Sequence, residues 1–129
     1  MWPFDRGKSL GARGERIARN LLNRQGLKIL AENYRCPSGE VDLIALQGAT
    51  REIPAETIIF VEVKTRSGDR YTDPSSAVDG DKRRRVQTAS RYYLRTHATE
   101  GYNVRFDIVS IVIQPGETPR VEHIVDAFQ

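Results

Sequence analysis

Apolar residues recur with two different periods along this chain of 129 residues, and the change of period divides it into elements. From Ser9 to about Gln25 they fall three or four positions apart, which predicts a helix with Ser9 as its N-cap and Gly26 as its stop. A second pattern of this kind predicts another long helix at residues 79–97. The residues expected on the apolar faces are Leu10, Gly14, Ile17, Ala18, Leu21 and Leu22 in the first helix, and Val86, Ala89 and Tyr93 in the second.

Shorter apolar runs predict strands at residues 28–34, 39–46, 58–66, 103–113 and 120–125. The apolar, β-branched character of the central runs is typical of strands buried on both faces, which need a layer of helices on each side. We therefore expect an α/β fold, a three-layer α/β/α sandwich with a central mixed sheet and an αβββαβ core. The first three strands would form an antiparallel meander. Residues 1–8 are expected to be an irregular lead-in to one domain at residues 9–129.

The composition excludes several classes of protein and several kinds of functional site. No apolar run approaches the length of a membrane span, and the first residues lack the apolar core of a signal peptide, so a cytoplasmic location is expected. Cys36 is the only cysteine, which excludes an internal disulfide and a zinc site built on cysteines. His97 and His123 are far apart in the sequence. Any metal would therefore be held by carboxylate oxygens, which favours Mg²⁺ or Mn²⁺.

Basic residues are unevenly distributed. The net charge of +3 is modest, but Lys82, Arg83, Arg84 and Arg85 are consecutive, and two further arginines follow in the same predicted helix. A local basic face of this kind is typical of phosphate binding. A solvated helix face is the alternative. Cations near a helix N-terminus oppose the helix dipole, which favours an anion beside them.

Two charged residues interrupt the apolar run at residues 58–66. Glu62 and Lys64 are two positions apart, so in a strand they point to the same face, about 6.6 Å from each other. Asp42 lies in the preceding strand, and the two carboxylates converge if the strand register allows it. A divalent cation would then take one oxygen from each acid, the Val63 carbonyl and water, with Lys64 beside a bound water. Glu15 in the first helix could complete the outer shell or bind a second metal.

Each of these residues also has a structural explanation. Asp42, Glu62 and Lys64 could form a buried ion cluster that fixes the strand register. Glu15 lies near the start of a helix, where the dipole favours an acid whatever its function.

The pattern resembles the PD-(D/E)xK nuclease superfamily, and more closely the small bacterial YraN family. The matching residues are Gly14-Glu15, Asn33-Tyr34-Arg35, residues 39–45 (GEVDLIA), residues 60–66 (FVEVKTR) and Lys82. The resemblance covers roughly residues 9 to 98. It implies the fold of restriction enzymes and archaeal Holliday-junction resolvases, with a Mg²⁺ site at Glu15, Asp42, Glu62 and Lys64 that hydrolyses phosphodiesters. Asp73 stands where a glycine is expected, and the loop at residues 47–57 is longer than usual.

The sequence thus predicts a Mg²⁺-dependent nuclease acting on nucleic acid, with branched or damaged DNA as the expected substrate. Asp42, Glu62, Val63 and Glu15 are the expected metal-binding residues, and Lys64 activates or orients the attacking water. The expected phosphate contacts are Arg66, Arg70, Lys82, Arg83 and Arg84. A homodimer would suit the cutting of two strands. The alternatives are a non-catalytic nucleic-acid-binding module that keeps the nuclease fold and, further off, a structural or protein-interaction domain.

Overall fold

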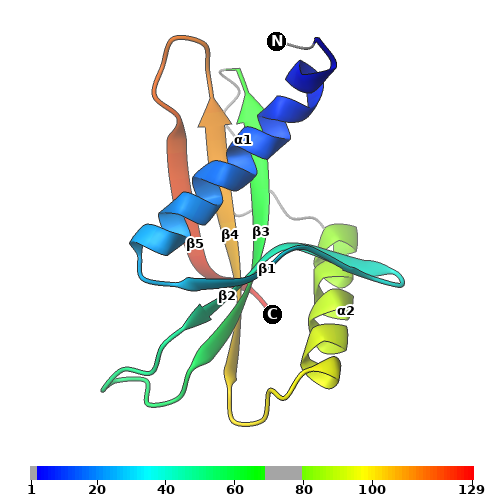
Figure 1. Cartoon of the computed structure of the whole chain (residues 1–129), viewed down its shortest axis with the longest axis vertical. Coiled ribbons are helices and arrows are strands. Elements are labelled where there is room, and N and C mark those ends of the chain that lie inside the picture. The colour runs from blue at the N-terminus through cyan, green and yellow to red at the C-terminus, as the bar shows by residue number, and fades with distance from the viewer. Residues whose placement is uncertain (1–2, 69–79) are drawn as a thin grey trace.

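The protein folds into a mixed five-stranded sheet with one helix on each side (Figure 1). The computed structural model describes residues 3–68 and 80–129. The elements follow the order αβββαββ, and the expected α/β fold is confirmed. Their bounds are α1 Pro3–Arg24, β1 Lys28–Cys36, β2 Gly39–Gln47, β3 Thr57–Ser67, α2 Gly80–Thr96, β4 Asn103–Ile113 and β5 Arg120–Phe128.

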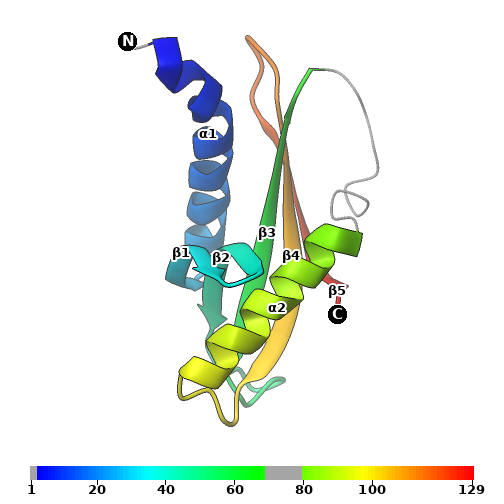
Figure 2. The ribbon, with the colours of Figure 1, turned by 90° about the vertical axis from the view of Figure 1, so that its right-hand side faces the viewer.

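The strands lie in the sheet in the order of the sequence, β1-β2-β3-β4-β5. The first three are antiparallel to their neighbours, β4 runs parallel to β3, and β5 returns antiparallel to β4. The parallel step needs a crossover connection, and α2 belongs to it. Figure 2 shows α1 on one face of the sheet and α2 on the other, so the sandwich has three layers.

Each helix covers its own hydrophobic core. On the α1 face, Ala18 and Leu22 pack against residues from three central strands, among them Leu43, Val61 and Val109. On the α2 face, Val86, Ala89 and Tyr93 pack against residues that include Val41, Ile44, Phe60 and Ile108. Burial on both faces explains the continuous apolar runs of β3 and β4.

The sheet divides between β2 and β3. These two strands pair from Gln47↔Thr57 to Leu43↔Val61, and the pairing ends there, although β3 continues to Ser67. From Leu43 back toward its start, strand β2 stays paired with β1 as far as the turn at the tip of their hairpin. The β1–β2 hairpin therefore diverges from β3 toward α2, as Figure 1 shows. We call the opening between the hairpin and the second half of β3 the fork.

Two glycines bring the helices close to the strands at this fork. A Cβ on Gly14 of α1 would lie 1.8 Å from Thr65 Oγ1 and 2.9 Å from Thr65 Cβ, so only glycine lets α1 approach β3 here. A Cβ on Gly39 would lie 2.8 Å from the backbone nitrogen of Ala89 in α2. The helix on each face is thus held close to the fork by a position without a side chain.

Several boundaries differ from those that the sequence predicts. The first helix begins at Pro3, so Ser9 lies inside it and is not its N-cap; proline is well suited to the first position of a helix because its missing N–H would have no partner there. Strand β5 extends to Phe128, three residues beyond the predicted end. Arg70 and Asp73 lie outside the described residues. No helix in the described part of the chain is long and apolar enough to cross a membrane.

Candidate metal and nucleic-acid site

Asp42 lies at the point where the fork opens. Its Oδ2 accepts a hydrogen bond of 2.8 Å from the backbone N–H of Val63, two positions beyond the last paired residue of β3. The carboxylate thus takes the place that a strand carbonyl would occupy if the pairing continued. This contact fixes Asp42 against the segment that carries Glu62 and Lys64.

Glu62 is buried in the same region, with 2% of its surface exposed. Its Oε2 lies 2.9 Å from the ammonium nitrogen of Lys82, in the first turn of α2. Burial, followed by the charge of Asp42 and a hydrogen bond with it, raises the pKa of Glu62 to about 8, although Lys82 acts in the opposite direction. The expected convergence of Asp42 and Glu62 therefore occurs, and the pair has a negative excess that is costly to bury.

Lys82 neutralises part of this negative charge. Burial lowers its pKa, but Glu62 and Asp42 together outweigh burial and the repulsion of Arg85, so the net pKa lies above the usual value for lysine. The sequence predicted Lys82 as a phosphate contact and gave no sign that it pairs with Glu62. In the structure its ammonium forms an ion pair with the buried acid.

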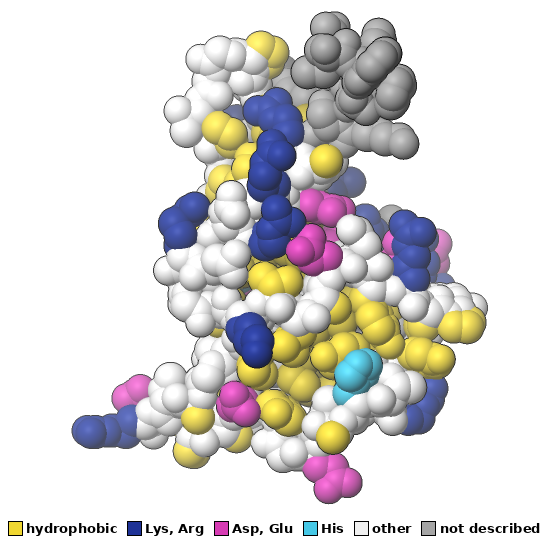
Figure 3. Space-filling model, viewed as in Figure 1, with side chains coloured by type: hydrophobic (Ala, Val, Ile, Leu, Met, Phe, Trp, Pro, Cys, Tyr) yellow, Lys and Arg dark blue, Asp and Glu magenta, His cyan; other side chains and the backbone are white. Residues whose placement is uncertain are grey.

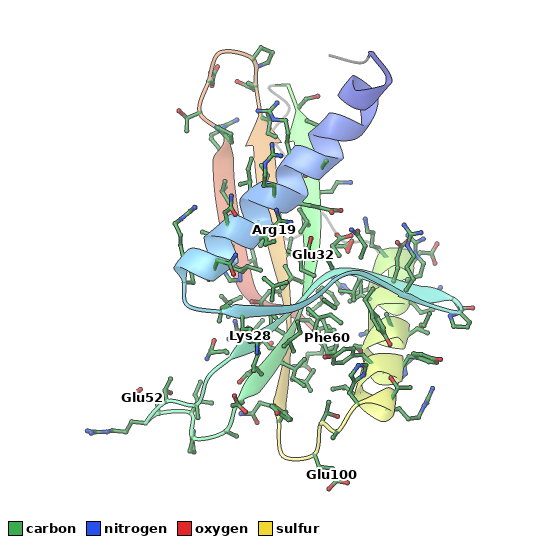
Figure 4. The ribbon with its side chains drawn as sticks, in the orientation of Figure 1. Arg19, Lys28, Glu32, Glu52, Phe60 and Glu100 are labelled. Carbon is green, nitrogen blue, oxygen red and sulfur yellow. The ribbon has the colours of Figure 1, made fainter. Side chains whose placement is uncertain are left out.

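Glu15 reaches the site from α1. Its Oε1 accepts a hydrogen bond of 3.3 Å from Asn33 Nδ2 on β1. Burial and the charges of Asp42 and Glu32 raise the pKa of Glu15, against the effects of Asn33 and Arg19. A neighbouring ion pair of 2.9 Å between Arg19 and Glu32, both labelled in Figure 4, ties the same helix to the same strand. Glu15 is thus within electrostatic range of Asp42.

Asn33, one of the residues that carry the family resemblance, contributes to the site although the sequence predicted no role for it there. Its φ of 50° places it in the left-handed region, which asparagine tolerates better than most residues. It follows a bulge between Ile29 and Ala31, and its amide holds Glu15. The available signal was an asparagine near the end of a predicted strand.

Lys64 is half-buried on the same face of β3 as Glu62. It lies opposite Ser110 in the parallel pairing with β4. Its position one strand repeat beyond Glu62 is the one that the sequence predicts.

The donor chemistry fits a hard divalent cation. Two carboxylates converge, and the one on Glu62 is almost completely shielded from water. Within residues 3–68 and 80–129, no three acidic, histidine or cysteine side chains lie together so as to hold a metal on their own. Mg²⁺ is commonly bound by one or two carboxylates and completes its shell with water and substrate oxygens. Asp42 and Glu62 would hold such an ion directly. Glu15 would act on it from the outer shell.

The expected phosphate contacts have different surroundings. Arg83 lies over the ring of Phe128, with 5.4 Å to its centre, and Arg84 forms an exposed ion pair of 2.8 Å with Asp81. Arg66 is half-buried near the end of β3. Figure 3 shows a further gathering of Lys and Arg side chains along α1, where Arg13, Arg16 and Arg24 are exposed. The phosphate contacts predicted from the sequence run from Arg66 in β3 to Arg84 in α2, and none of them lies in α1.

Two more arginines gather beside the hairpin tip. Arg35 of β1 and Arg85 of α2 each lie 3.7 Å from a different oxygen of Glu40. All three side chains are at least 46% exposed, so water screens both pairs strongly. They line a pocket of about 370 Å³ with Cys36, Ser38 and Gly39. One acid between two loosely held arginines leaves a local positive excess.

A second buried acid lies on β4. Asp107 is completely buried and receives two hydrogen bonds of 2.9 Å from Arg105 and one of 2.9 Å from the amide of Asp126. His123 Nε2 lies 2.8 Å from its Oδ2. Burial raises the pKa of Asp107, but these partners together hold it below the usual value. The carboxylate receives the amide of Asp126 where the pairing of β4 with β5 shifts register.

Related proteins cover nearly the whole chain. Residues 14–111 match the family described as "Uncharacterised protein family UPF0102". A UPF0102 protein of Syntrophus aciditrophicus is 44% identical over 119 residues, which are 92% of this chain and 87% of that protein. A UPF0102 protein of Rhodococcus opacus is 42% identical over 93% of this chain and 96% of its own length. One of Geobacter metallireducens is 40% identical over 95% of this chain and 93% of its own length. The chain therefore belongs to the UPF0102 family.

Proposed function

We propose that this protein is a divalent-metal-dependent nuclease of the PD-(D/E)xK type, which it resembles through the YraN-like motifs, and that it hydrolyses phosphodiester bonds in DNA. The observation that carries the proposal is the junction of Asp42 with the buried Glu62 at the fork. The fold would be stable without a second acid at this point, since the backbone contact to Val63 needs only Asp42. The negative excess of the pair suits a divalent cation.

The roles follow from the positions of the side chains. Asp42 and Glu62 bind the cation, which supplies a Lewis acid and lowers the pKa of bound water. Lys64, on the same face as Glu62, orients the attacking water and stabilises the charge that develops on the phosphate. Glu15 supports the site from α1, and the Asn33 amide fixes its direction. The exposed arginines of α1 and α2 flank the fork and would bind the phosphates on either side.

The test is cleavage of branched, nicked and single-stranded DNA with Mg²⁺, with Mn²⁺ or with EDTA. We expect cleavage in the presence of metal, and a loss of 100-fold or more in Glu62→Gln and in Lys64→Met. Glu52→Gln is the matched control, because Glu52 is exposed on the β2–β3 loop, away from the fork (Figure 4). Metal-dependent cutting that is equal in all four proteins would come from a contaminant and would overturn the assignment.

One observation favours a second function. The ion pair between Lys82 and Glu62 partly neutralises the acids by a side chain of the protein itself, so the fold tolerates the site without metal. A nucleic-acid-binding module that does not cut would have this property. Strong binding that weakens steeply with salt, with no cleavage of DNA or RNA under any metal condition, would select this function over the nuclease.

A further inference from the structure

We propose that Lys82 is the resident counter-ion of the metal site: its ammonium holds Glu62 in the metal-free protein, leaves when a divalent cation binds, and then becomes available to a phosphate of the nucleic acid. The inference rests on the proposed function, because it requires a cation to bind at Asp42 and Glu62. It gives Lys82 the role of a positioning residue that exchanges Glu62 for a phosphate.

The contact geometry carries the first step. Lys82 Nζ lies 2.9 Å from Oε2 of a carboxylate that is only 2% exposed. In so enclosed a place the ammonium occupies the approach to one of the two oxygens that a cation could use. The charge balance points the same way. Asp42 and Glu62 carry two negative charges when both are ionised, and one ammonium leaves an excess that a divalent cation removes completely. An ammonium kept at contact distance from that cation would then be repelled.

A displaced Lys82 side chain can move to the protein surface. Its side chain is 34% exposed although its end reaches a buried acid, and its four-carbon stem is flexible. Lys82 belongs to the first turn of α2, whose later residues include Arg85, three positions further along the helix. Arg85 lines the pocket with Arg35 at the hairpin tip. A released ammonium would therefore join a surface that already has a positive excess.

The chain allows a direct test because it has only four lysines, Lys8, Lys28, Lys64 and Lys82. Trace acetylation followed by mass spectrometry would report the reactivity of each amine with EDTA and with Mg²⁺ or Mn²⁺, in the absence of nucleic acid. We expect metal to raise the labelling of Lys82 several-fold and to leave that of exposed Lys28 unchanged. In Glu62→Gln, Lys82 should be reactive without metal and should gain nothing from it. Glu52→Gln should behave as the wild-type protein does.

Binding of Mn²⁺, followed separately by electron paramagnetic resonance, distinguishes the two proposals. Metal binding with Lys82 equally or better protected would overturn the exchange and leave the nuclease assignment intact, since the cation would then use the other oxygen of Glu62. A lysine with a purely structural role would likewise be labelled to the same extent with and without metal. No Mn²⁺ binding in the wild-type protein would overturn both proposals.

Discussion

Glu62 and Asp107 are two acids on neighbouring parallel strands, equally well hidden from water, yet their surroundings differ in charge. Glu62 faces one ammonium and a second carboxylate, and its pKa rises to about 8. Asp107, on the opposite face of the sheet, is surrounded by a guanidinium, an imidazole and a backbone amide, and its pKa falls. The exposed fraction is 2% for Glu62 and 0% for Asp107, so the extent of burial does not distinguish the two acids.

The difference separates an acid whose charge the fold balances from one whose charge the fold balances only in part. Every partner of Asp107 comes from β4 or β5, and together they fix the register shift between these strands. Glu62 is held against a like charge, an arrangement that destabilises the ionised form of the site. A protein keeps such a site where the cost is offset by binding or catalysis. The residual charge around a buried acid is therefore the more informative feature.

The largest expected effect is on stability, when Asp107 loses its charge. Asp107→Asn leaves the Arg105 guanidinium without its carboxylate and should cost about 3–5 kcal/mol of the free energy of unfolding. Glu62→Gln should change stability by less than about 1 kcal/mol at pH 7, because the lost attraction to Lys82 is offset by the relief of the repulsion from Asp42. Urea unfolding measures both. Asp126→Asn is the control for the chemical change, since that side chain is exposed and asparagine tolerates its φ of 55°. Equal losses in Asp107→Asn and Glu62→Gln would remove the distinction.

The pH dependence should have opposite signs at the two acids. The pKa of Glu62 is raised from 4.5 to about 8, so the folded protein binds the extra proton between these values and loses stability as the pH rises through them. Relative to Glu62→Gln, the wild-type protein should lose at least about 2 kcal/mol of stability between pH 5 and pH 9. The lowered pKa of Asp107 acts the other way: its stabilisation is complete above pH 3.8 and is lost at lower pH. Urea titrations at several pH values test both signs, and a difference from Glu62→Gln that does not vary with pH would contradict the assignment for Glu62.

The sequence contained enough to predict the sheet and to pair Asp42 with Glu62, but not the surroundings of either buried acid. Continuous apolar runs give strands buried on both faces, and a hairpin connection makes β2 and β3 neighbours, so their acids converge if the register allows it. The pairing of Lys82 with Glu62 depends on where α2 starts relative to β3, which no local pattern determines. The partner of Asp107 lies sixteen residues away and is brought into line by a register shift. Both contacts are set by tertiary packing.

The close packing of α1 against β3, the strand that carries Glu62, is tested by two glycines of α1. Gly14→Ala would place its Cβ against Thr65, at distances that a rotation of the threonine does not relieve, so α1 should shift from β3 at a cost of about 1–3 kcal/mol. Gly11→Ala meets nothing within 4 Å and should stabilise the helix by about 0.5–1 kcal/mol. Thermal unfolding compares them. If both variants gain stability, the close approach of α1 to β3 is not present in solution.

The smallest expected effect is at Glu40, a third acid, which is half-exposed and lies between two arginines. Glu40→Gln should change stability by less than about 0.5 kcal/mol, because both of its ion pairs are solvent-exposed contacts of 3.7 Å. It should nevertheless strengthen nucleic-acid binding and steepen its salt dependence, since Arg35 and Arg85 lose the anion that competes with phosphate. Glu100→Gln is the control, an equal change of charge at an exposed position beyond α2 (Figure 4). If the two variants bind equally, only net charge matters, and the hairpin arginines do not contact the nucleic acid. A gain confined to Glu40→Gln would mean that an exposed acid lowers affinity at this surface without supporting the fold, which is the reverse of what Asp107 does.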